Sequence, residues 1–140
     1  MMRQEITHFH IETRGSGPVD ITAEIARWVR DSGIRTGLLT IQVRHTSASL
    51  VVQENADPEA MRDLERFLQR LVPAGDPLFR HTAEGPDDMP AHVRAALTHT
   101  TLSLPVADGA PTLGTWQGIY LYEHRRRPHR REVVGHLLGE

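Results

Sequence analysis

Two runs of branched and apolar residues, separated by a short polar segment, constrain the fold of this sequence most strongly. They cover residues 37–43 and 49–54. Such residues favour strands, so we expect both runs to be central strands of a β-sheet. The polar residues His45, Thr46 and Ser47 follow directly where the first strand ends. A strand end is a rigid place to mount functional side chains.

Four other segments show strand patterns, and turn residues separate them. Residues 100–106 alternate with Leu102, Leu104 and Val106 on one face. Asp108 and Gly109 then form a turn. The remaining expected strands lie at residues 4–14, 115–123 and 131–138.

Three segments show the start signals and the spacing of helices. Asp20 can cap the first, which ends at Gly33. Asp57 and Pro58 begin the second, and Pro90 can open a third that reaches residue 99. The expected buried residues are Ile21, Ile25, Trp28 and Val29 in the first helix, Met61, Leu64, Leu68 and Leu71 in the second, and Val93 and Leu97 in the third.

About seven strands and about three helices follow in mixed order, without the regular alternation of a parallel doubly wound sheet. The sequence therefore predicts the α+β class, with a mixed or antiparallel sheet. At 140 residues the chain has the size of one domain, so we expect a single domain over residues 1–140.

Composition and charge exclude several classes of protein. No apolar run has the length of a spanning helix and no signal peptide is visible, so we expect no membrane partner and a cytoplasmic location. A formal net charge of −2 argues against a nucleic-acid partner. The one basic run, residues 125–131, is expected to be a solvated hairpin turn rather than a phosphate-binding patch. Because there is no cysteine, a metal site would need imidazole and oxygen ligands.

The densest group of chemically active side chains lies in residues 81–92, which hold two histidines and three carboxylates. Two prolines and a glycine indicate a loop, and a loop of this polarity is typical of a functional site. His92 falls in the first turn of the expected third helix, where the helix dipole disfavours imidazolium and leaves the ring free to bind a metal.

We therefore expect His45, His81 and His92 to converge on one divalent metal ion. Three imidazoles with an open fourth position suit zinc better than magnesium, which prefers oxygen ligands. Nearby carboxylates from Glu84, Asp87 and Asp88 could orient the ligands. His8 and His10 would share one face of the first strand, but they lack a third ligand beside them and form at most half of a metal site.

Several motifs from Asp20 onward resemble those of the YjbQ family, described as secondary thiamine-phosphate synthases. The resemblance implies a compact α+β domain that assembles as a homotrimer, with a divalent metal in some members. It also implies a weak activity that joins hydroxymethylpyrimidine diphosphate to thiazole phosphate and releases pyrophosphate. The motifs are His-Thr-Ser-Ala-Ser from residue 45, Asn-Ala-Asp-Pro from residue 55, Glu-Gly-Pro-Asp-Asp-Met-Pro-Ala-His from residue 84, Gly-Thr-Trp-Gln from residue 114 and the final Gly-Glu.

The resemblance also implies roles for individual residues. His45, His81 and His92 would bind the metal, while Asn55, Glu84 and Asp88 would act in catalysis by orienting the ligands or a water. The small, phosphorylated substrate would contact Arg44, Ser47, Trp116 and Gln117. For Trp116, packing is as good an explanation as stacking on a substrate ring.

Two other functions remain open at this point. Departure of diphosphate is normally assisted by magnesium on carboxylates, whereas these motifs offer imidazoles. A metal-dependent hydrolase of a small molecule, with Glu84 or Asp88 as the base, fits the imidazoles better. A metal-binding or ligand-binding trimer without catalytic activity is the third possibility.

Overall fold

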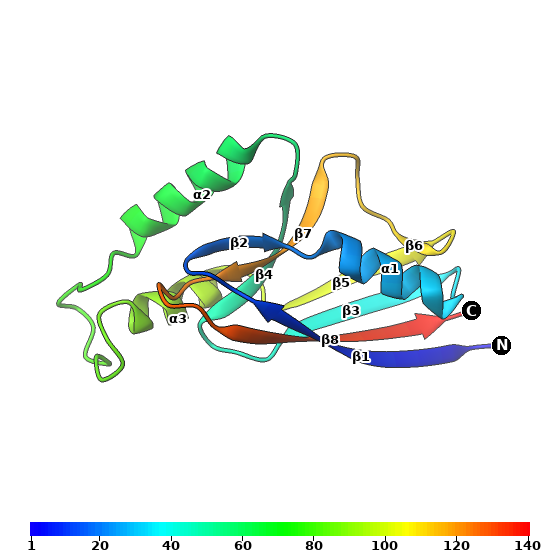
Figure 1. The fold of residues 1–140 in the computed structure, drawn as a ribbon, viewed down its shortest axis with the longest axis horizontal. Helices are drawn as coiled ribbons and strands as arrows, with labels where there is room; N and C mark the ends of the chain where they lie inside the picture. Colours follow the sequence, from blue (N-terminus) through cyan, green and yellow to red (C-terminus); the bar gives the residue numbers. More distant parts are fainter.

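Eight strands form two antiparallel sheets in the computed structural model, which describes residues 1–140 (Figure 1). The larger sheet has five strands, in the order β1 (Arg3–Glu12), β8 (Arg130–Gly139), β3 (Gly37–Val43), β5 (Thr101–Ala107) and β6 (Ala110–Pro111). The smaller sheet has three, in the order β2 (Gly17–Asp20), β7 (Gln117–Glu123) and β4 (Ala48–Glu54).

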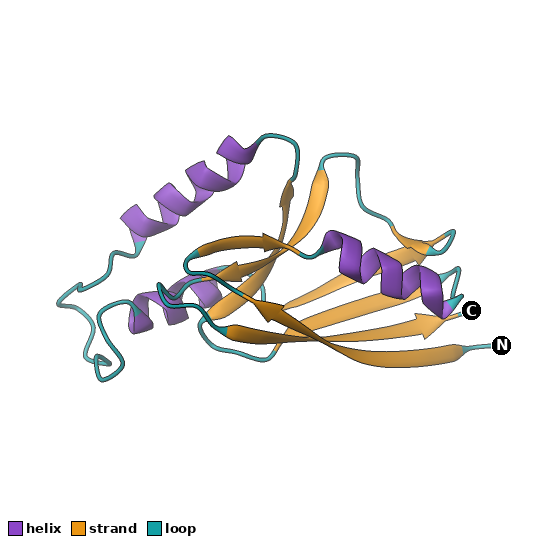
Figure 2. Ribbon diagram, in the orientation of Figure 1, coloured by secondary structure: helices purple, strands orange, loops and turns teal.

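The main core lies between the larger sheet, helix α1 (Thr22–Ser32) and one face of the smaller sheet. Strand β3 has one face toward this core, because Leu39 and Ile41 are buried while Leu38 is exposed on the opposite face. Helix α1 lies across the larger sheet (Figure 2) and contributes Ile25 and Val29 to the core. It ends at Gly33, whose left-handed φ of 75° suits a residue without Cβ.

The smaller sheet is covered on its other face as well. Helix α2 (Pro58–Leu71) packs Met61 and Leu68 against Val51, Tyr120 and Tyr122. Helix α3 (Asp88–Leu97) packs beside β4 through small residues, Ala91 and Ala95 among them. Strand β4 is therefore buried on both faces over its first four residues.

The predicted α+β class is confirmed, with two sheets in place of one. The two central strands and the strict alternation of β5 are also confirmed. Two short strands are missing from the prediction, β2 and β6. They have only four and two residues and include proline, so they carry no strand pattern of their own. None of the three helices combines the length and the apolar character that spanning a membrane requires.

Some helix predictions are wrong in detail. Helix α3 starts at Asp88, two residues before Pro90, and a proline in the first turn is tolerated because its missing N–H would be unpaired there. Leu71 and Leu97 are exposed, although the spacing predicts both as buried. Helical spacing indicates which side of a helix faces inward, but not how far along that side a covering surface extends.

Candidate functional site

Three side chains that can bind a metal meet where the loop after α2 enters helix α3. Asp88 is the first residue of α3 and His92 lies one turn later, so both project from the same side of the helix. His81 approaches from the loop. Its Nε2 lies 2.9 Å from Asp88 Oδ2, and Nε2 of His92 lies 3.1 Å from the same oxygen. The ligand atoms of these residues, here called the His81–Asp88–His92 group, all lie within 4.8 Å of one another.

The hydrogen bonds of His92 leave a place for a proton or a metal ion beside Asp88. Its Nδ1 lies 2.8 Å from the carbonyl oxygen of Thr46, which can only accept, so Nδ1 carries a proton. In a neutral ring Nε2 then bears a lone pair that faces the carboxylate oxygen of Asp88, whereas in an imidazolium Nε2–H donates to that oxygen. Two acceptors at this distance require a proton or a metal ion between them. An Nδ1–H bound to a carbonyl is also the usual support of a histidine metal ligand.

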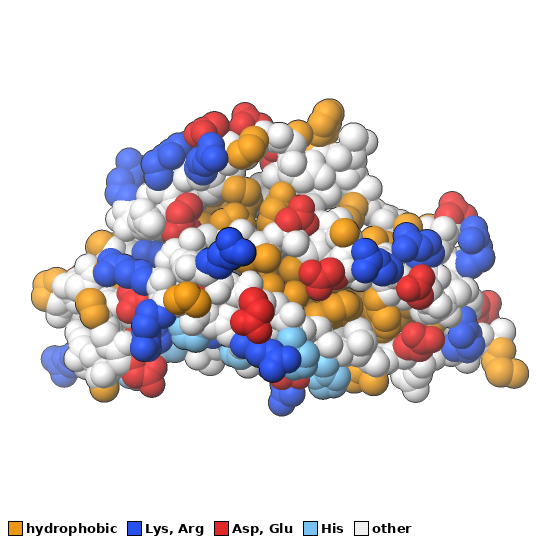
Figure 3. Space-filling model, in the orientation of Figure 1, with side chains coloured by type: hydrophobic (Ala, Val, Ile, Leu, Met, Phe, Trp, Pro, Cys, Tyr) orange, Lys and Arg blue, Asp and Glu red, His pale blue; other side chains and the backbone are white.

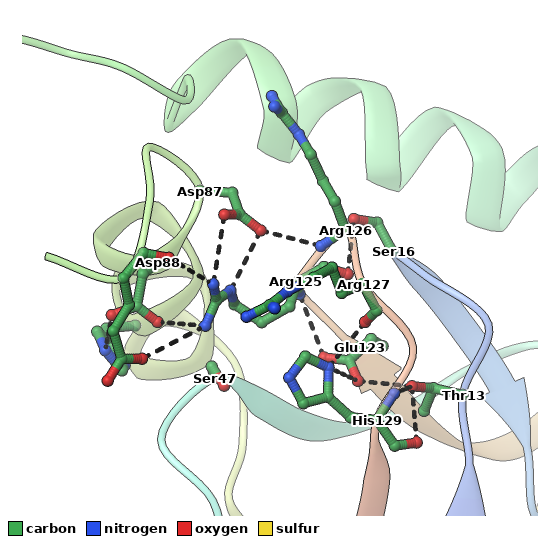
Figure 4. Close-up of polar contacts among 12 residues, drawn as sticks. Thr13, Ser16, Ser47, Asp87, Asp88, Glu123, Arg125, Arg126, Arg127 and His129 are labelled. Carbon is green, nitrogen blue, oxygen red and sulfur yellow. Dashed lines mark hydrogen bonds and ion pairs between the residues drawn. The ribbon is translucent and has the colours of Figure 1, made fainter. Parts of the chain in front are cut away.

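Arg125 holds the carboxylates of the site in place. Its Nη1 donates to Asp88 Oδ1 at 2.8 Å, its Nε donates to Asp87 Oδ2 at 3.1 Å, and its Nη2 donates to the Glu84 carbonyl at 2.9 Å (Figure 4). Burial alone would raise the pKa of the Asp88 carboxyl, but His81, His92 and Arg125 together hold it below its ordinary value. Asp88 is therefore a carboxylate at neutral pH.

The buried position of Arg125 corrects the expected solvated turn at residues 125–131. The segment does connect β7 to β8, yet Arg125 and Arg131 at its two ends are only 5% and 4% exposed. Arg131 donates from Nε to Glu123 Oε1 at 2.9 Å and from Nη2 to Ser47 Oγ at 2.9 Å. Desolvation raises the pKa of Glu123, but bonds from Arg131 and Thr13 outweigh it, and the carboxyl stays ionised.

His45 does not belong to the group that the structure brings together. Its Nε2 accepts the backbone N–H of Glu132 at 2.8 Å, so that nitrogen is occupied. Burial, followed by the charge of Arg131, lowers the pKa of His45. The ring lines a shallow surface hollow that it shares with His92. The set that the structure brings together is thus two imidazoles and the Asp88 carboxylate, not three imidazoles.

Other predicted site residues lie outside this group. Asn55 and Gln117 are joined by a hydrogen bond from Asn55 Nδ2 to the Gln117 carbonyl at 3.3 Å, and the Gln117 side chain accepts the N–H of Gly114. The Trp116 side chain is 64% exposed. Asn55 lines a separate hollow beneath α2, in which apolar atoms are visible in Figure 3.

The remaining candidates are divided between the site and the outer face of the larger sheet. Glu84 is exposed, with Oε2 3.7 Å from Arg125 Nη1. Arg44 pairs with Glu132 at 3.3 Å, and His8 Nδ1 lies 2.5 Å from the same carboxylate. Histidines gather along this part of the molecule in Figure 3. His8 and His10 do share the exposed face of β1, and they are not part of the His81–Asp88–His92 group.

Sequence reasoning missed Arg125, Arg131 and Glu123 as residues that support the site. One signal was available, because Glu123 directly follows the apolar run 119–122. A carboxylate that is buried with such a run needs a positively charged partner. The strand contains no such partner. Arg131 supplies it from the neighbouring strand β8.

The fold and this group define a class: a two-sheet α+β domain with an imidazole–carboxylate cluster at the entry to its third helix. The family described as UPF0047 protein YjbQ-like matches residues 7–140, and the chain belongs to this family. A UPF0047 protein of Synechocystis sp. is 52% identical over 130 residues, which cover 93% of this chain and 88% of that protein. The UPF0047 protein YjbQ of Escherichia coli O157:H7 is 43% identical over 121 residues, with 86% and 87% covered.

Solved structures agree with the fold along the whole chain. A YbjQ-like protein of unknown function from Sulfolobus solfataricus superposes with a TM-score of 0.91 at 26% identity, covering 100% of both chains. A hypothetical protein from Aeropyrum pernix gives a TM-score of 0.88 at 31% identity, covering 97% of this chain and 99% of the other. These proteins establish the family and the fold, and the function has to be argued from the site.

Proposed function

We propose that His81, Asp88 and His92 bind one divalent metal ion and that the chain is an enzyme acting on a small phosphorylated molecule. The observation that carries the proposal is the approach of His81 Nε2 and His92 Nε2 to the same oxygen of Asp88, with all three ligand atoms within 4.8 Å of one another. Two imidazoles and one carboxylate suit zinc, whereas magnesium prefers an all-oxygen set. A bound ion would supply Lewis acidity toward a phosphoryl oxygen or a leaving group.

The residues of the chain would prepare this site in two ways. Arg125 fixes one oxygen of Asp88 and leaves the other directed at His81 and His92. The Thr46 carbonyl fixes the tautomer and orientation of the His92 ring. Because Arg131 holds Ser47, the segment that carries this carbonyl is itself anchored. Glu84 is exposed and pairs with Arg125 at 3.7 Å, and it is the carboxylate that we propose for proton transfer.

The reaction to test first is the one that the family resemblance implies, formation of thiamine phosphate. In it, the bond between the pyrimidine methylene carbon and the diphosphate oxygen breaks, pyrophosphate leaves, and the thiazole nitrogen bonds to that carbon. The departing negative charge needs positive groups and N–H donors. A second candidate, hydrolysis of a small phosphorylated molecule, is favoured by the ligand set, because two histidines with one carboxylate are typical of hydrolytic zinc sites.

The metal site is tested by zinc content in purified variants. We expect His92→Ala and Asp88→Asn to hold well below one zinc per chain after dialysis, while circular dichroism shows an intact fold. His45→Ala should keep its zinc, because the structure places His45 outside the group. His8→Ala is the matched control on the exposed face of β1. Unchanged zinc in His92→Ala would remove that residue from the ligand set.

The activity is tested by thiamine phosphate formation from the two precursors, with and without a chelator. We expect turnover to depend on the metal and to fall by at least about tenfold in Asp88→Asn, because even residues that only support metal ligands have effects of about 10- to 100-fold. Equal turnover in Asp88→Asn and wild type would exclude the synthase proposal at this site. Phosphate release from a phosphomonoester, without thiamine phosphate formation, would favour the hydrolase.

A further inference from the structure

A polar pocket lies between α2, α3 and the turn from β7 to β8, and it includes none of His81, Asp88 or His92. Its volume is about 270 Å³. At roughly 30 Å³ for each water molecule, this space could hold about nine waters or one small ligand. The polar residues that line it are Ser16, Gln69, Asp87, Arg94, His124 and Arg126.

Two buried nitrogen atoms of this lining have no hydrogen-bond partner. They are Arg94 Nε and His124 Nδ1, and they are the only buried side-chain polar atoms of the protein left unpaired. Arg94 is 7% exposed and His124 is 1% exposed. An unsatisfied buried donor costs about 1–3 kcal/mol, so native proteins rarely leave one without a partner. Two such atoms beside one pocket indicate that the pocket holds their partner.

A chain of hydroxyl groups behind His124 allows Nδ1 to be a donor. His124 Nε2 lies 2.8 Å from Ser49 Oγ, which lies 2.6 Å from Thr98 Oγ1. If Thr98 donates to Ser49 and Ser49 donates to Nε2, the proton of the neutral ring is on Nδ1. If both hydroxyls turn, Nε2 carries the proton and Thr98 donates to the Arg94 carbonyl at 2.9 Å. A ligand in the pocket can therefore select the tautomer.

The charge around the pocket is positive. Arg94 donates from Nη2 to the Val72 carbonyl, which leaves its charge without a carboxylate partner. Arg126 is exposed, and its side chain extends from the turn toward α2 in Figure 4. The Asp87 carboxylate is the one negative group, and it is already occupied by the Arg125 side chain and the Arg126 N–H. His124 stays neutral, because burial and then the charge of Arg94 lower its pKa to about 3.

We propose that this Arg94–His124 pocket binds a tetrahedral oxyanion, either inorganic phosphate or the phosphoryl group of a small phosphomonoester. Arg94 Nε–H and His124 Nδ1–H have almost no contact with solvent in the structure, so the lining must shift slightly for them to donate to the oxygens of the anion, and the Arg126 guanidinium closes over it from the exposed side. Bound anion selects the tautomer with the proton on Nδ1. The site is distinct from the His81–Asp88–His92 group and does not depend on a metal there.

The test is a titration of chelator-treated wild-type protein with inorganic phosphate at constant ionic strength, followed by NMR of ¹⁵N-labelled histidine rings. His124→Phe identifies the signals of residue 124, and phenyl phosphate serves as the second ligand. We expect saturable shifts at His124 toward the Nδ1–H tautomer. We also expect Arg126→Ala to weaken phosphate binding about tenfold, which corresponds to 1.4 kcal/mol. Shifts with both ligands would indicate a phosphoryl-group site, and shifts with phosphate alone a site for the free ion.

Arg127→Ala is the matched control, because Arg127 is the next residue of the same exposed turn and does not line the pocket. Arg127→Ala should change phosphate affinity less than twofold, compared with about tenfold for Arg126→Ala. Equal weakening in both variants would show diffuse attraction and overturn the proposal. Absence of any change at His124 in millimolar phosphate, or unchanged affinity in His124→Phe, would overturn it as well.

Discussion

Arg125 illustrates how one buried side chain can organise a polar site. Its guanidinium contacts Asp87, Asp88 and the Glu84 carbonyl, so it satisfies acceptors from three positions of one loop. Bidentate geometry of this kind is specific to arginine, and a lysine could not reproduce it. The loop therefore has a fixed conformation next to the histidines. The buried charge of Arg125 is tolerated because the carboxylates of Asp87 and Asp88 compensate it.

His124 gives a residue-level prediction about pH. Burial first, then Arg94 and Arg131, lower its pKa from 6.5 to about 3, and only Glu123 opposes the shift. Below pH 6.5 the unfolded chain binds a proton at this residue that the folded chain excludes. The free energy of unfolding should therefore fall by about 1.4 kcal/mol per pH unit as the pH decreases from this value toward 3, with no such contribution above it.

Urea unfolding at a series of pH values measures this slope. His124→Phe removes the titrating ring, and its aromatic side chain can keep the stacking on Tyr122. Between pH 3 and 6.5, the slope of the unfolding free energy against pH should be smaller in the variant than in wild type by about 1.4 kcal/mol per pH unit. This difference does not depend on the absolute stability of the variant. Identical slopes in the two proteins would show that His124 is protonated in the folded state.

At the level of elements, β3 and β4 organise the molecule. Strand β3 is the central strand of the larger sheet, paired with β8 on one side and β5 on the other. Strand β4 faces the main core on one side and α2 with α3 on the other. The four residues between them, 44–47, do not have to form a hairpin turn, because β3 and β4 lie in different sheets. The segment between them is free to carry His45, Thr46 and Ser47 to the site.

The alternating burial along β3 predicts a large loss of stability for one leucine and a small loss for its neighbour. Leu39→Ala removes a fully buried side chain and should lower the free energy of unfolding by about 2–5 kcal/mol. Leu38→Ala is the control in the same strand, because Leu38 is 47% exposed on the opposite face. Its effect in chemical denaturation should stay below about 1 kcal/mol. A loss for Leu38→Ala as large as that for Leu39→Ala would show that the outer face of the sheet is also covered.

At the scale of the whole molecule, the two sheets place polar side chains from distant parts of the chain together at one end. Thr13 of the segment after β1 donates to Glu123 of β7 (Figure 4). Arg131 of β8 donates to the same Glu123 and to Ser47 before β4. This buried network anchors the segment whose carbonyl orients His92. The homotrimer that the family resemblance implies stays a prediction, as does the cytoplasmic location.

Local patterns in the sequence determined the elements and the class of fold. A run of branched and apolar residues marked β3, alternation marked β5, and Asp57 with Pro58 marked the start of α2, because these signals act between residues close in the chain. The same holds for His81, Asp88 and His92, which lie within one loop and one helical turn and were all singled out as site residues.

The tertiary structure alone decided which of these side chains share a site and which support it. The Glu132 N–H occupies Nε2 of His45, while Asp88 joins His81 and His92 among the potential ligands. The basic segment at residues 125–131 is partly buried because Arg125 is received by Asp88 of α3 and Arg131 by Glu123 on another strand. A charge becomes buried only where partners converge in space, and no local pattern encodes that convergence.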